Sequence, residues 1–512
     1  MPFNAVFSHI IKRRLPRIHR FSKDPLLCQN ETLKFLVDNA KETVFGHANK
    51  FNSIRSIKSF QDQVPLSNYD SLKPYIDREL NGEENVLWPG KTNWFAKSSG
   101  TTLSRQKLLP ITVDSLYENH YAGGKDLLAM YYQNFQNRKL YNAKHLIVGG
   151  STQINSLSND TSIGDLSALI VENLPWWTEI RRAPKREIAL MNDWEQKLDK
   201  MAKATIKENI CIVVGLPSWT LLLMHKILDI SGKKNIHEVW PDLELYIHGG
   251  MNIEPYRKAF EQIFPNPKMN YVEAYNASEG YFGFQDQIDS KDLLLLCDSH
   301  IFFEFIPMSE FNEINSKTVL SLKDVEIGQE YAIVISTSAG LWRHIIGDTI
   351  KFVTTSPFRF NITGRTSQYI NAFGEKLIVS HAENAVAEAS NLNQVKIIDY
   401  TVAPFFTEHS GIGGHEWAIA FKDPPEDLEK FKVDLDHFLK IQNGDYQGKR
   451  NASINMALPK VNIVHPSTFE NWLKQKNKLG GQHKIPRLNQ DRLFLEEIHE
   501  ISNKMAINSY IY

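Results

Sequence analysis

Four hydroxyl side chains surround a glycine in the stretch Ser98-Ser99-Gly100-Thr101-Thr102, and Lys107 follows it. The stretch lies between the apolar runs 94–96 and 108–111, which predict two strands joined by a tight loop. Glycine lets the backbone approach a ligand closely, hydroxyls and amides donate hydrogen bonds to anionic oxygens, and lysine adds positive charge. The pattern therefore predicts a phosphate-binding loop, although it is not a Walker loop. The alternative is a Ser/Thr-rich turn that hydrogen-bonds its own backbone.

Two later stretches also carry groups that suit a nucleotide. In Tyr275-Asn276-Ala277-Ser278-Glu279-Gly280, a ring and a carboxylate follow a predicted strand. The ring can contact a purine, and the carboxylate can bind the magnesium that accompanies its phosphates. In 342–348 (WRHIIGD), Gly347 supports a tight turn and Asp348 can accept hydrogen bonds from both ribose hydroxyls. Each stretch alone is also consistent with an ordinary loop, but the three together, in this order, favour nucleotide chemistry.

Composition narrows the class of protein. The chain has 512 residues, enough for about two to four structural units. Its formal net charge is -1, from 58 basic and 59 acidic residues. The charge of the whole chain therefore gives no electrostatic attraction that would favour nucleic-acid binding. The three cysteines, Cys28, Cys211 and Cys297, lie far apart and indicate neither a disulfide framework nor a zinc site. We expect a basic amphipathic N-terminal helix that packs on the body, no membrane span and a cytoplasmic protein.

The elements that must position these residues follow an α/β rhythm. A helix is predicted at 31–45, within a helical opening layer. Apolar runs at 146–148, 210–214 and 243–247 each end in glycine or a turn, and helices at 219–230 and 254–264 come between and after them. Buried parallel strands with polar loops at their carboxyl ends produce this pattern. The sequence therefore predicts an α/β fold whose ligand site lies at those strand ends.

The C-terminal part has a different rhythm. Strands are predicted at 293–296, 301–306, 331–336 and 350–353, and the pattern breaks from Ser356 to Arg365. A helix, two strands, a helix and a strand then follow, which indicates a small α+β domain. We expect a large N-terminal domain of β-sheets packed by helices at 1–362 and a small C-terminal domain at 363–512.

The three motifs, followed by Gly364-Arg365 at this junction, resemble the adenylate-forming superfamily of acyl-CoA synthetases, luciferases and peptide-synthetase adenylation domains. Within it, SSGTT with a downstream lysine, YNASEG and WRHIIGD are similar to the Gretchen Hagen type, the auxin-responsive acyl acid amido synthetases. The resemblance extends over nearly the whole chain, including GQHKIPR at 481–487. Two departures from the wider superfamily are Ser104, at the place of a second loop glycine, and Trp342, at the place of a tyrosine.

The resemblance implies a two-step reaction that uses ATP and Mg2+ in a protein that acts as a monomer. A carboxylic acid forms an acyl adenylate and pyrophosphate, and an amino acid amine then forms an amide and releases AMP. It implies ATP-binding and acyl-binding roles for 1–362 and a mobile lid role for 363–512. It also implies residue roles. The phosphates are expected on Ser98, Ser99, Gly100, Thr101, Thr102 and Lys107, and adenine on Gly249, Gly250 and Tyr275. Asn276 and Ser278 are expected to bind the nucleotide as well, Asp348 the ribose, and Glu279 the magnesium.

The catalytic set implied by the resemblance adds Arg365 at the hinge and two lysines that compete for the lid role, Lys376 and Lys484. Each lysine has the alternative of being a solvated surface side chain. Positions that select the acid are expected at 121–132 and 214–218, and they do not reveal which acid it is.

Two other functions remain open at this stage. The first is an acyl-CoA ligase of the same superfamily, in which a thiol is the second nucleophile. The second is a regulatory protein that has the same fold and binds a nucleotide without catalysing a reaction. The retention of Glu279, Asp348 and the complete SSGTT stretch argues against the regulator.

Overall fold

The computed structural model describes residues 2–98, 107–135, 138, 140–149, 155–156, 161–191, 193–250, 253, 256–288, 290–366, 369–370, 375, 377–406, 413–443, 446–447, 450, 456–476, 485–489 and 491–508. The chain divides into two compact units. Unit 1 consists of Met1–Ile346 and Ile350–Asn361, and unit 2 consists of Gly347–Thr349 and Ile362–Tyr512. The chain passes between the units along β15 (His344–Thr355) and β16 (Phe358–Arg365). The predicted break from Ser356 to Arg365 is therefore wrong for most of its length, because it is a strand.

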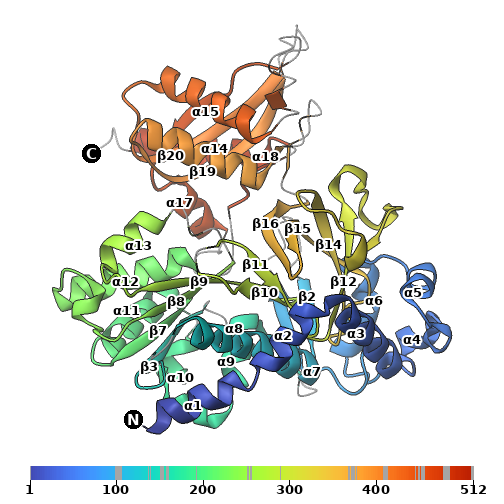
Figure 1. Cartoon of the computed structure of the whole chain (residues 1–512). Coiled ribbons are helices and arrows are strands. Elements are labelled where there is room, and N and C mark those ends of the chain that lie inside the picture. Colours follow the sequence, from blue (N-terminus) through green and yellow to red (C-terminus); the bar gives the residue numbers. More distant parts are fainter. Residues whose placement is uncertain are drawn as a thin grey trace. The chain divides into compact units, whose positions relative to one another are not determined.

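Twelve strands of the described residues form the main sheet, in the order β13-β12-β14-β15-β16-β11-β10-β9-β8-β7-β3-β6 (Figure 1). At one end of this order, β6, β3, β7, β8 and β9 run parallel to their neighbours. The parallel strands confirm the predicted α/β fold, and their carboxyl ends lie at one edge of the sheet. The strands are β3 (Lys144–Val148), β6 (Arg182–Ala183), β7 (Ile210–Gly215), β8 (Leu245–His248), β9 (Asn270–Ala277), β10 (Gly280–Gln285), β11 (Leu293–Leu295), β12 (Ile301–Pro307), β13 (Leu320–Ser321) and β14 (Glu330–Thr337).

The two faces of the parallel strands belong to different hydrophobic clusters because successive side chains of a strand point to opposite faces. Val213 of β7 packs with α11, α12 and α13, whereas Ile212 packs in the cluster that contains α8. Helices therefore cover both faces (Figure 1). They are α8 (Tyr121–Asn134), α10 (Arg186–Ala189), α11 (Trp194–Thr205), α12 (Pro217–Ser231) and α13 (Arg257–Ile263). Helix α9 (Leu166–Glu172) packs in a separate cluster with Ala96 and Ile111.

Helix α12 shows why the local sequence forms these elements. Pro217 occupies the first helical turn, where a missing N–H costs nothing, and Gly232 ends the helix in the left-handed conformation with a φ of 66°. The prediction of a helix at 219–230 is confirmed. Helix α13 starts at Arg257, later than the predicted residue 254.

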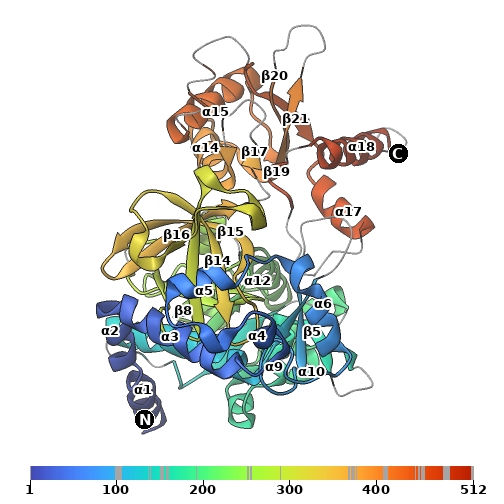
Figure 2. The same cartoon turned by 90° about the vertical axis from the view of Figure 1, so that its right-hand side faces the viewer.

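The N-terminal helices form the predicted opening layer beside the antiparallel strands, where the blue helices α3 to α6 lie together in both views (Figures 1 and 2). The predicted helix at 31–45 is divided, because α3 ends at Ala40 and Thr43 caps α4 by accepting a hydrogen bond from the Gly46 N–H. These helices are α1 (Pro2–Lys12), α2 (Leu15–Lys23), α3 (Pro25–Ala40), α4 (Val44–Ala48), α5 (Ile57–Gln63) and α6 (Tyr69–Leu80).

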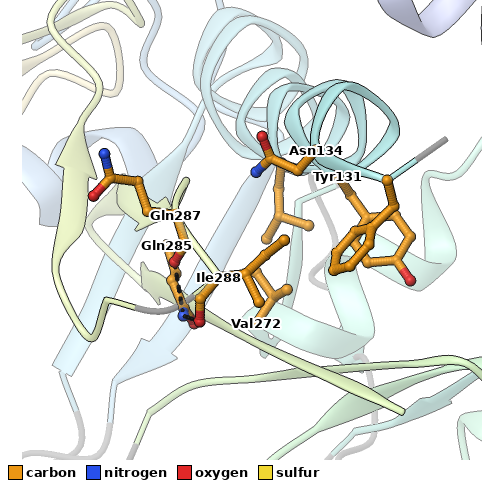
Figure 3. Close-up of a pocket in the computed structure, with 8 residues that line it drawn as sticks. Tyr131, Asn134, Val272, Gln285, Gln287 and Ile288 are labelled. Atoms are coloured by element: carbon orange, nitrogen blue, oxygen red, sulfur yellow. Dashed lines mark hydrogen bonds between the residues drawn. The ribbon is translucent and has the colours of Figure 1, made fainter. Parts of the chain in front are cut away.

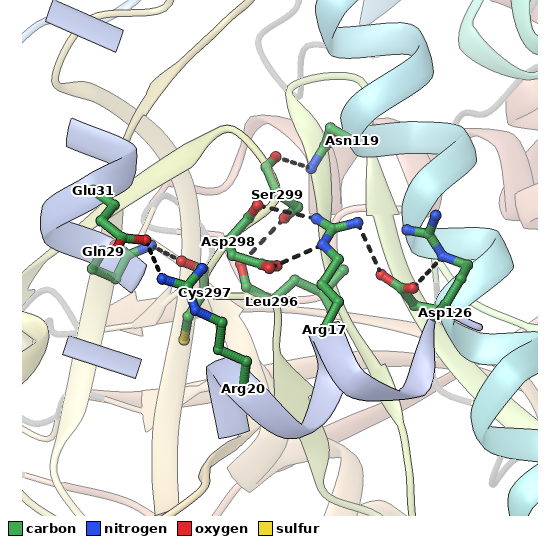
Figure 4. Close-up of polar contacts among 11 residues, drawn as sticks. Arg17, Arg20, Gln29, Glu31, Asn119, Asp126, Leu296, Cys297, Asp298 and Ser299 are labelled. Carbon is green, nitrogen blue, oxygen red and sulfur yellow. Dashed lines mark hydrogen bonds and ion pairs between the residues drawn. The ribbon is translucent and has the colours of Figure 1, made fainter. Parts of the chain in front are cut away.

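The basic N-terminal region is fastened to the body by ion pairs (Figure 4). Nε of Arg14 lies 2.5 Å from Oδ1 of Asp126 in α8, and Nε of Arg17 lies 2.9 Å from Oδ2 of Asp298. Because the Asp126 side chain is fully buried, these contacts hold α2 firmly against unit 1. The expected packing of this region on the body is confirmed. In the described part of the chain, no helix is both long and apolar enough to cross a membrane.

Unit 2 contains a three-stranded sheet in the order β19-β20-β21, with helices on both faces (Figure 2). Trp417 and Ile419 of β20 pack with α14 and α15, whereas Ala418 and Ala420 pack with α17 and α18. The α+β rhythm predicted for this part is confirmed. Its elements are β17 (Tyr369–Ile370), β18 (Leu377–Ile378), α14 (Val379–Leu392), β19 (Lys396–Phe406), β20 (Gly413–Asp423), α15 (Leu428–Gln442), β21 (Lys460–Val464), α17 (Thr468–Gln475) and α18 (Leu493–Asn508).

Candidate active site

The two predicted strands around the SSGTT stretch are present in unit 1. They are β1 (Trp94–Ser98) and β2 (Lys107–Ile111), which pair antiparallel and join a smaller sheet with β5 (Ser162–Asp165) and β4 (Asn155–Ser156). Ser98 and Lys107 are cross-strand partners, so they mark the two ends of the loop. The predicted phosphate-binding residues between them, Ser99, Gly100, Thr101 and Thr102, lie outside the described residues.

Lys107 is positioned at the end of this loop by an aromatic side chain of α6. Its Nζ lies 5.7 Å from the centroid of the Tyr69 ring, a favourable place for a cation. The hydroxyl of Tyr69 accepts a hydrogen bond of 3.1 Å from the N–H of Leu108. One side chain therefore holds both the lysine and the first residues of β2.

Glycine is required where β8 ends. A Cβ at Gly249 would lie 2.1 Å from the carbonyl oxygen of Ala274 in β9, a distance that no side chain tolerates. Gly250 has a φ of 76°, in the left-handed region. The chain therefore needs glycine at both predicted adenine-binding positions, at the carboxyl edge of the parallel strands.

The YNASEG motif forms a hairpin in which β9 and β10 flank the turn at Ser278-Glu279. The Tyr275 ring is buried and packs edge-on against Phe282, with 4.8 Å between the ring centroids. Glu279 is half-buried and lies at the tip of the hairpin. The motif therefore places a half-buried carboxylate at the tip of the hairpin and a buried aromatic ring in β9.

Two residues that the sequence analysis did not single out hold this hairpin. Asn119 and His120 end the π-helix η2 (Leu116–His120), which lies between α7 (Val113–Ser115) and α8. The Asn119 side chain bonds the main chain of Tyr281, and Nδ1 of His120 lies 2.9 Å from Oδ1 of Asn276. Burial lowers the pKa of His120 to about 4, so its ring is neutral at pH 7.

The WRHIIGD motif is divided between structural and site residues. Arg343 is buried, pairs with Glu304 at 2.9 Å and 3.0 Å, and donates to the carbonyl oxygens of Gln61 and Val64. It therefore ties the N-terminal helices to the sheet. The predicted tight turn at Gly347 is wrong, because Gly347 lies inside β15 with a φ of 86°.

Unit 2 brings two predicted residues together. Nε of Arg365 in β16 lies 3.1 Å from Oδ1 of Asp348 in β15. The strands are also joined here by a 3.0 Å hydrogen bond between the hydroxyls of Thr363 and Thr349. The guanidinium holds the carboxylate in one orientation.

The two candidate lysines, Lys376 and Lys484, lie outside the described residues, but neighbours of both are anchored in unit 2. The carboxylate of Glu375 lies 2.8 Å from Nε2 of His415, and both side chains are fully buried. After Lys484, Arg487 pairs with Asp399 and lies over the Tyr400 ring.

One small pocket lies between α8 and the strands β9 and β10 (Figure 3). Its volume is about 10 Å³, which leaves room for about one water molecule. Leu127 and Tyr131 belong to the range 121–132 that is expected to select the acid, but the pocket is too small for an acid or a nucleotide. It is lined by Leu127, Tyr131, Asn134, Phe135, Val272, Gln285, Gln287 and Ile288.

Comparison with family models decides the family. The GH3 family N-terminal domain matches residues 14–269, the central domain matches 294–365, and the C-terminal domain matches 380–493. The chain belongs to the GH3 family. The resemblance seen in the three motifs is thereby confirmed.

Several curated relatives of this GH3 chain are amido synthetases, which are ligases that form amide bonds. The chain is 24% identical over 552 residues to indole-3-acetic acid-amido synthetase GH3.3 of Arabidopsis thaliana, covering 92% of this chain and 90% of the relative. It is 23% identical over 509 residues to indole-3-acetic acid-amido synthetase GH3.8 of Oryza sativa subsp. indica, covering 84% and 82%.

Solved structures show the same fold. AtGH3.15 acyl acid amido synthetase in complex with 2,4-DB matches this GH3 chain with a TM-score of 0.79 and 16% identity, covering 96% of both chains. A 2-hydroxyisobutyryl-CoA ligase in the postadenylation state matches with a TM-score of 0.51 and 13% identity, covering 96% of this chain and 91% of that chain. The chain therefore shares the fold of these two enzymes.

A buried lysine in this GH3 chain also had no local signal. Lys197 of α11 has no exposed surface, and its Nζ donates a 3.0 Å hydrogen bond to the carbonyl oxygen of Gly149 after β3. Burial lowers its pKa to about 8. In the sequence, Lys197 looks like any solvent-exposed lysine of a helix. Only the structure shows that it is buried and bonded to Gly149.

Proposed function

We propose that this chain is an ATP-dependent acyl acid amido synthetase. In the first step, a carboxylate oxygen of the acid attacks the α-phosphorus of ATP, an acyl adenylate forms, and pyrophosphate leaves. In the second step, an amino acid amine attacks the acyl carbon, the C–N bond forms, the bond to AMP breaks, and the amine loses a proton. The observation that carries this proposal is that the GH3 family models match all three parts of a chain that retains Glu279 and Asp348.

The proposed phosphate site consists of the SSGTT stretch and Lys107. Hydroxyl and amide donors of Ser98, Ser99, Gly100, Thr101 and Thr102 bind the phosphate oxygens, and Lys107 lowers the energy of the charge that develops on the leaving pyrophosphate. Support comes from the strand-to-strand geometry of β1 and β2, which brings both ends of the loop together.

The residues present also fit a magnesium ion bound together with the phosphates. Among the described residues, no group of three or more His, Cys, Asp or Glu side chains could hold a metal alone. One half-buried carboxylate at the tip of a hairpin, Glu279, suits Mg2+, which keeps several waters and uses substrate phosphates as ligands. When bound, the ion neutralises phosphate charge.

The remaining roles are proposed from the motif positions. Gly249, Gly250 and Tyr275 frame the adenine, and Asp348 holds the ribose. Asn276 and Ser278 also bind the nucleotide. Arg365 lies at the hinge, and Lys376 or Lys484 approaches the reacting phosphate. In this proposal 1–362 binds ATP and the acid, and 363–512 is the mobile lid of a cytoplasmic monomer.

Exchange of labelled pyrophosphate into ATP tests the first step. Aryl, indolyl and fatty acids are screened with Mg2+ and without amines, and exchange that depends on one acid class supports adenylation and names the donor. An amino acid panel and coenzyme A are then compared as acceptors. An amide product supports the proposal, whereas a thioester would make the chain an acyl-CoA ligase. Binding of ATP with no exchange for any acid would favour a regulator.

A further inference from the structure

The π-helix η2 places two consecutive side chains against opposite limbs of the hairpin that carries Glu279. Such a helix inserts an extra residue into the turn, and short π-helices are frequent at functional sites. Asn119 reaches β10, and His120 reaches β9. The two strands meet here in one rung, because Asn276 and Tyr281 are cross-strand partners.

Asn119 fixes the β10 side of this rung. Its Oδ1 accepts a 2.7 Å hydrogen bond from the N–H of Tyr281, and its Nδ2 donates 3.0 Å bonds to the carbonyl oxygens of Tyr281 and Ser299. Figure 4 shows the contact with Ser299. A Cβ at Gly280 would lie 3.3 Å from Oδ1 of Asn119, so glycine permits this close approach. The amide side chain therefore uses both its donor and its acceptor groups on the main chain.

His120 fixes the β9 side. The amide oxygen Oδ1 of Asn276 only accepts hydrogen bonds, so Nδ1 of His120 carries the proton in their 2.9 Å contact. The His120 side chain is 4% exposed, and burial keeps the ring neutral. A neutral, buried donor with one defined tautomer holds the Asn276 side chain in one orientation.

We propose that Asn119 and His120 are positioning residues for nucleotide binding, which hold the Asn276–Tyr281 rung and thereby the Ser278–Glu279 turn. The inference rests on the proposed function, because it assigns the turn to Mg-ATP. Neither residue touches the nucleotide. The turn lies between Asn276 and Tyr281 in the chain and close to both, so a shift of this pair moves the Glu279 carboxylate. A displacement of about 1 Å can cost about 100-fold in rate.

Three variants separate positioning from general packing. His120→Leu removes the donor, whereas His120→Asn keeps a donor nitrogen at the place of Nδ1. His145→Leu is the matched control, because His145 also makes one 2.9 Å hydrogen bond, to the carbonyl oxygen of Leu140, away from the hairpin. The affinity for Mg-ATP is measured by calorimetry, and pyrophosphate exchange is measured in parallel.

We expect His120→Leu to weaken Mg-ATP binding about tenfold, since one hydrogen bond contributes about 1.4 kcal/mol. His120→Asn should stay within about threefold of the wild type, and His145→Leu within about twofold. Equal loss in both His120 variants, or an equal loss in His145→Leu, would overturn the inference. Unchanged binding in His120→Leu would do the same.

A second readout needs no nucleotide. Imidazole nitrogen NMR of the chain, with the His120 signals assigned by their loss in His120→Asn, should show a neutral ring protonated at Nδ1. Asn276→Ala should shift these signals. If His120→Leu fails to fold, Asn119→Ala provides the second binding variant, because it removes the hydrogen bonds to the main chain of Tyr281. An unshifted spectrum would overturn the contact between His120 and Asn276.

The proposed function and the positioning role can fail separately. If the wild type binds Mg-ATP but shows no pyrophosphate exchange, the proposed function is overturned, and the Mg-ATP affinities of the variants still decide the positioning role. If the wild type does not bind Mg-ATP, both are overturned.

Discussion

Nε2 of His415 lies 2.8 Å from Oε1 of Glu375, and neither side chain has exposed surface. The pair joins β20 to the residue that precedes Lys376 in unit 2. Asn443 adds a 2.9 Å hydrogen bond to the Glu375 carbonyl oxygen, so the main chain and the side chain of Glu375 are both held. The candidate lysine therefore follows a fixed point in the structure.

Replacing His415 should destabilise unit 2. In His415→Leu the Glu375 carboxylate loses this partner while it stays buried, and we expect a loss of about 3 kcal/mol in the free energy of unfolding. Urea denaturation measures it. The control is Lys504→Ala, which breaks an exposed pair with Glu500 and should cost about 0.5 kcal/mol or less. A loss below about 1 kcal/mol in His415→Leu would contradict the buried-pair interpretation.

Replacing Glu279 should abolish adenylation and leave the fold intact. Glu279→Gln keeps the size of the side chain and removes the negative charge that we assign to magnesium, so pyrophosphate exchange should fall about 100-fold or more. The matched control, Glu261→Gln, changes an exposed carboxylate on α13 and should retain full exchange. Exchange near the wild-type rate in Glu279→Gln would remove this residue from the metal role.

Replacing Asp348 should weaken ATP use without unfolding the chain. Asp348→Asn removes the charge that pairs with Arg365 and one acceptor for the ribose. We expect the KM for ATP to rise about tenfold or more, from the loss of about 1.5 kcal/mol or more in a charged hydrogen bond. The measurement is exchange at varied ATP, with 2'-deoxy-ATP as a comparison. A variant that still discriminates against 2'-deoxy-ATP as the wild type does would argue against ribose binding by Asp348.

The stability of the chain should depend on Glu79. Burial raises the pKa of its carboxyl from 4.5 to about 7. The folded state therefore binds the Glu79 proton more tightly than the unfolded state does. The contribution of protonated Glu79 to the free energy of unfolding is complete below pH 4.5 and is lost as the pH rises through about 7. The loss at pH 8 is on the order of 3 kcal/mol.

Glu79→Gln tests this dependence, because the amide stays neutral at every pH. Urea denaturation at pH 5 and pH 8 should show a smaller fall in stability for Glu79→Gln than for the wild type. The N–H of Leu87, which donates to Oε1 of Glu79, keeps an acceptor in the variant. Parallel curves for the two proteins would contradict the assignment.

Much of the fold could be predicted from local patterns. The strands β1 and β2 around SSGTT, the helix α12 and the parallel strands that end in glycine were all predictable, because apolar periodicity and turn residues act over a few neighbours. The strand β16 was missed although Phe358, Phe360 and Ile362 alternate with polar residues, because Pro357 and Gly364 on either side of this short run are typical of a loop. Gly347 likewise looked like a turn residue until β15 was known.

The sequence by itself determined the family and the chemical groups, because the three motifs are runs of specific side chains that survive without any coordinates. Only the tertiary structure decided what holds those groups. His120 and Asn276 are 156 positions apart, and Asn119 and Tyr281 are 162 apart. No local pattern marks such pairs, since their hydrogen bonds form only when the π-helix is packed against the β9–β10 hairpin. Arg343 is the opposite case. It belongs to a motif that predicted a nucleotide site, but the structure shows it buried and bonded to Glu304 and to the main chain of Gln61.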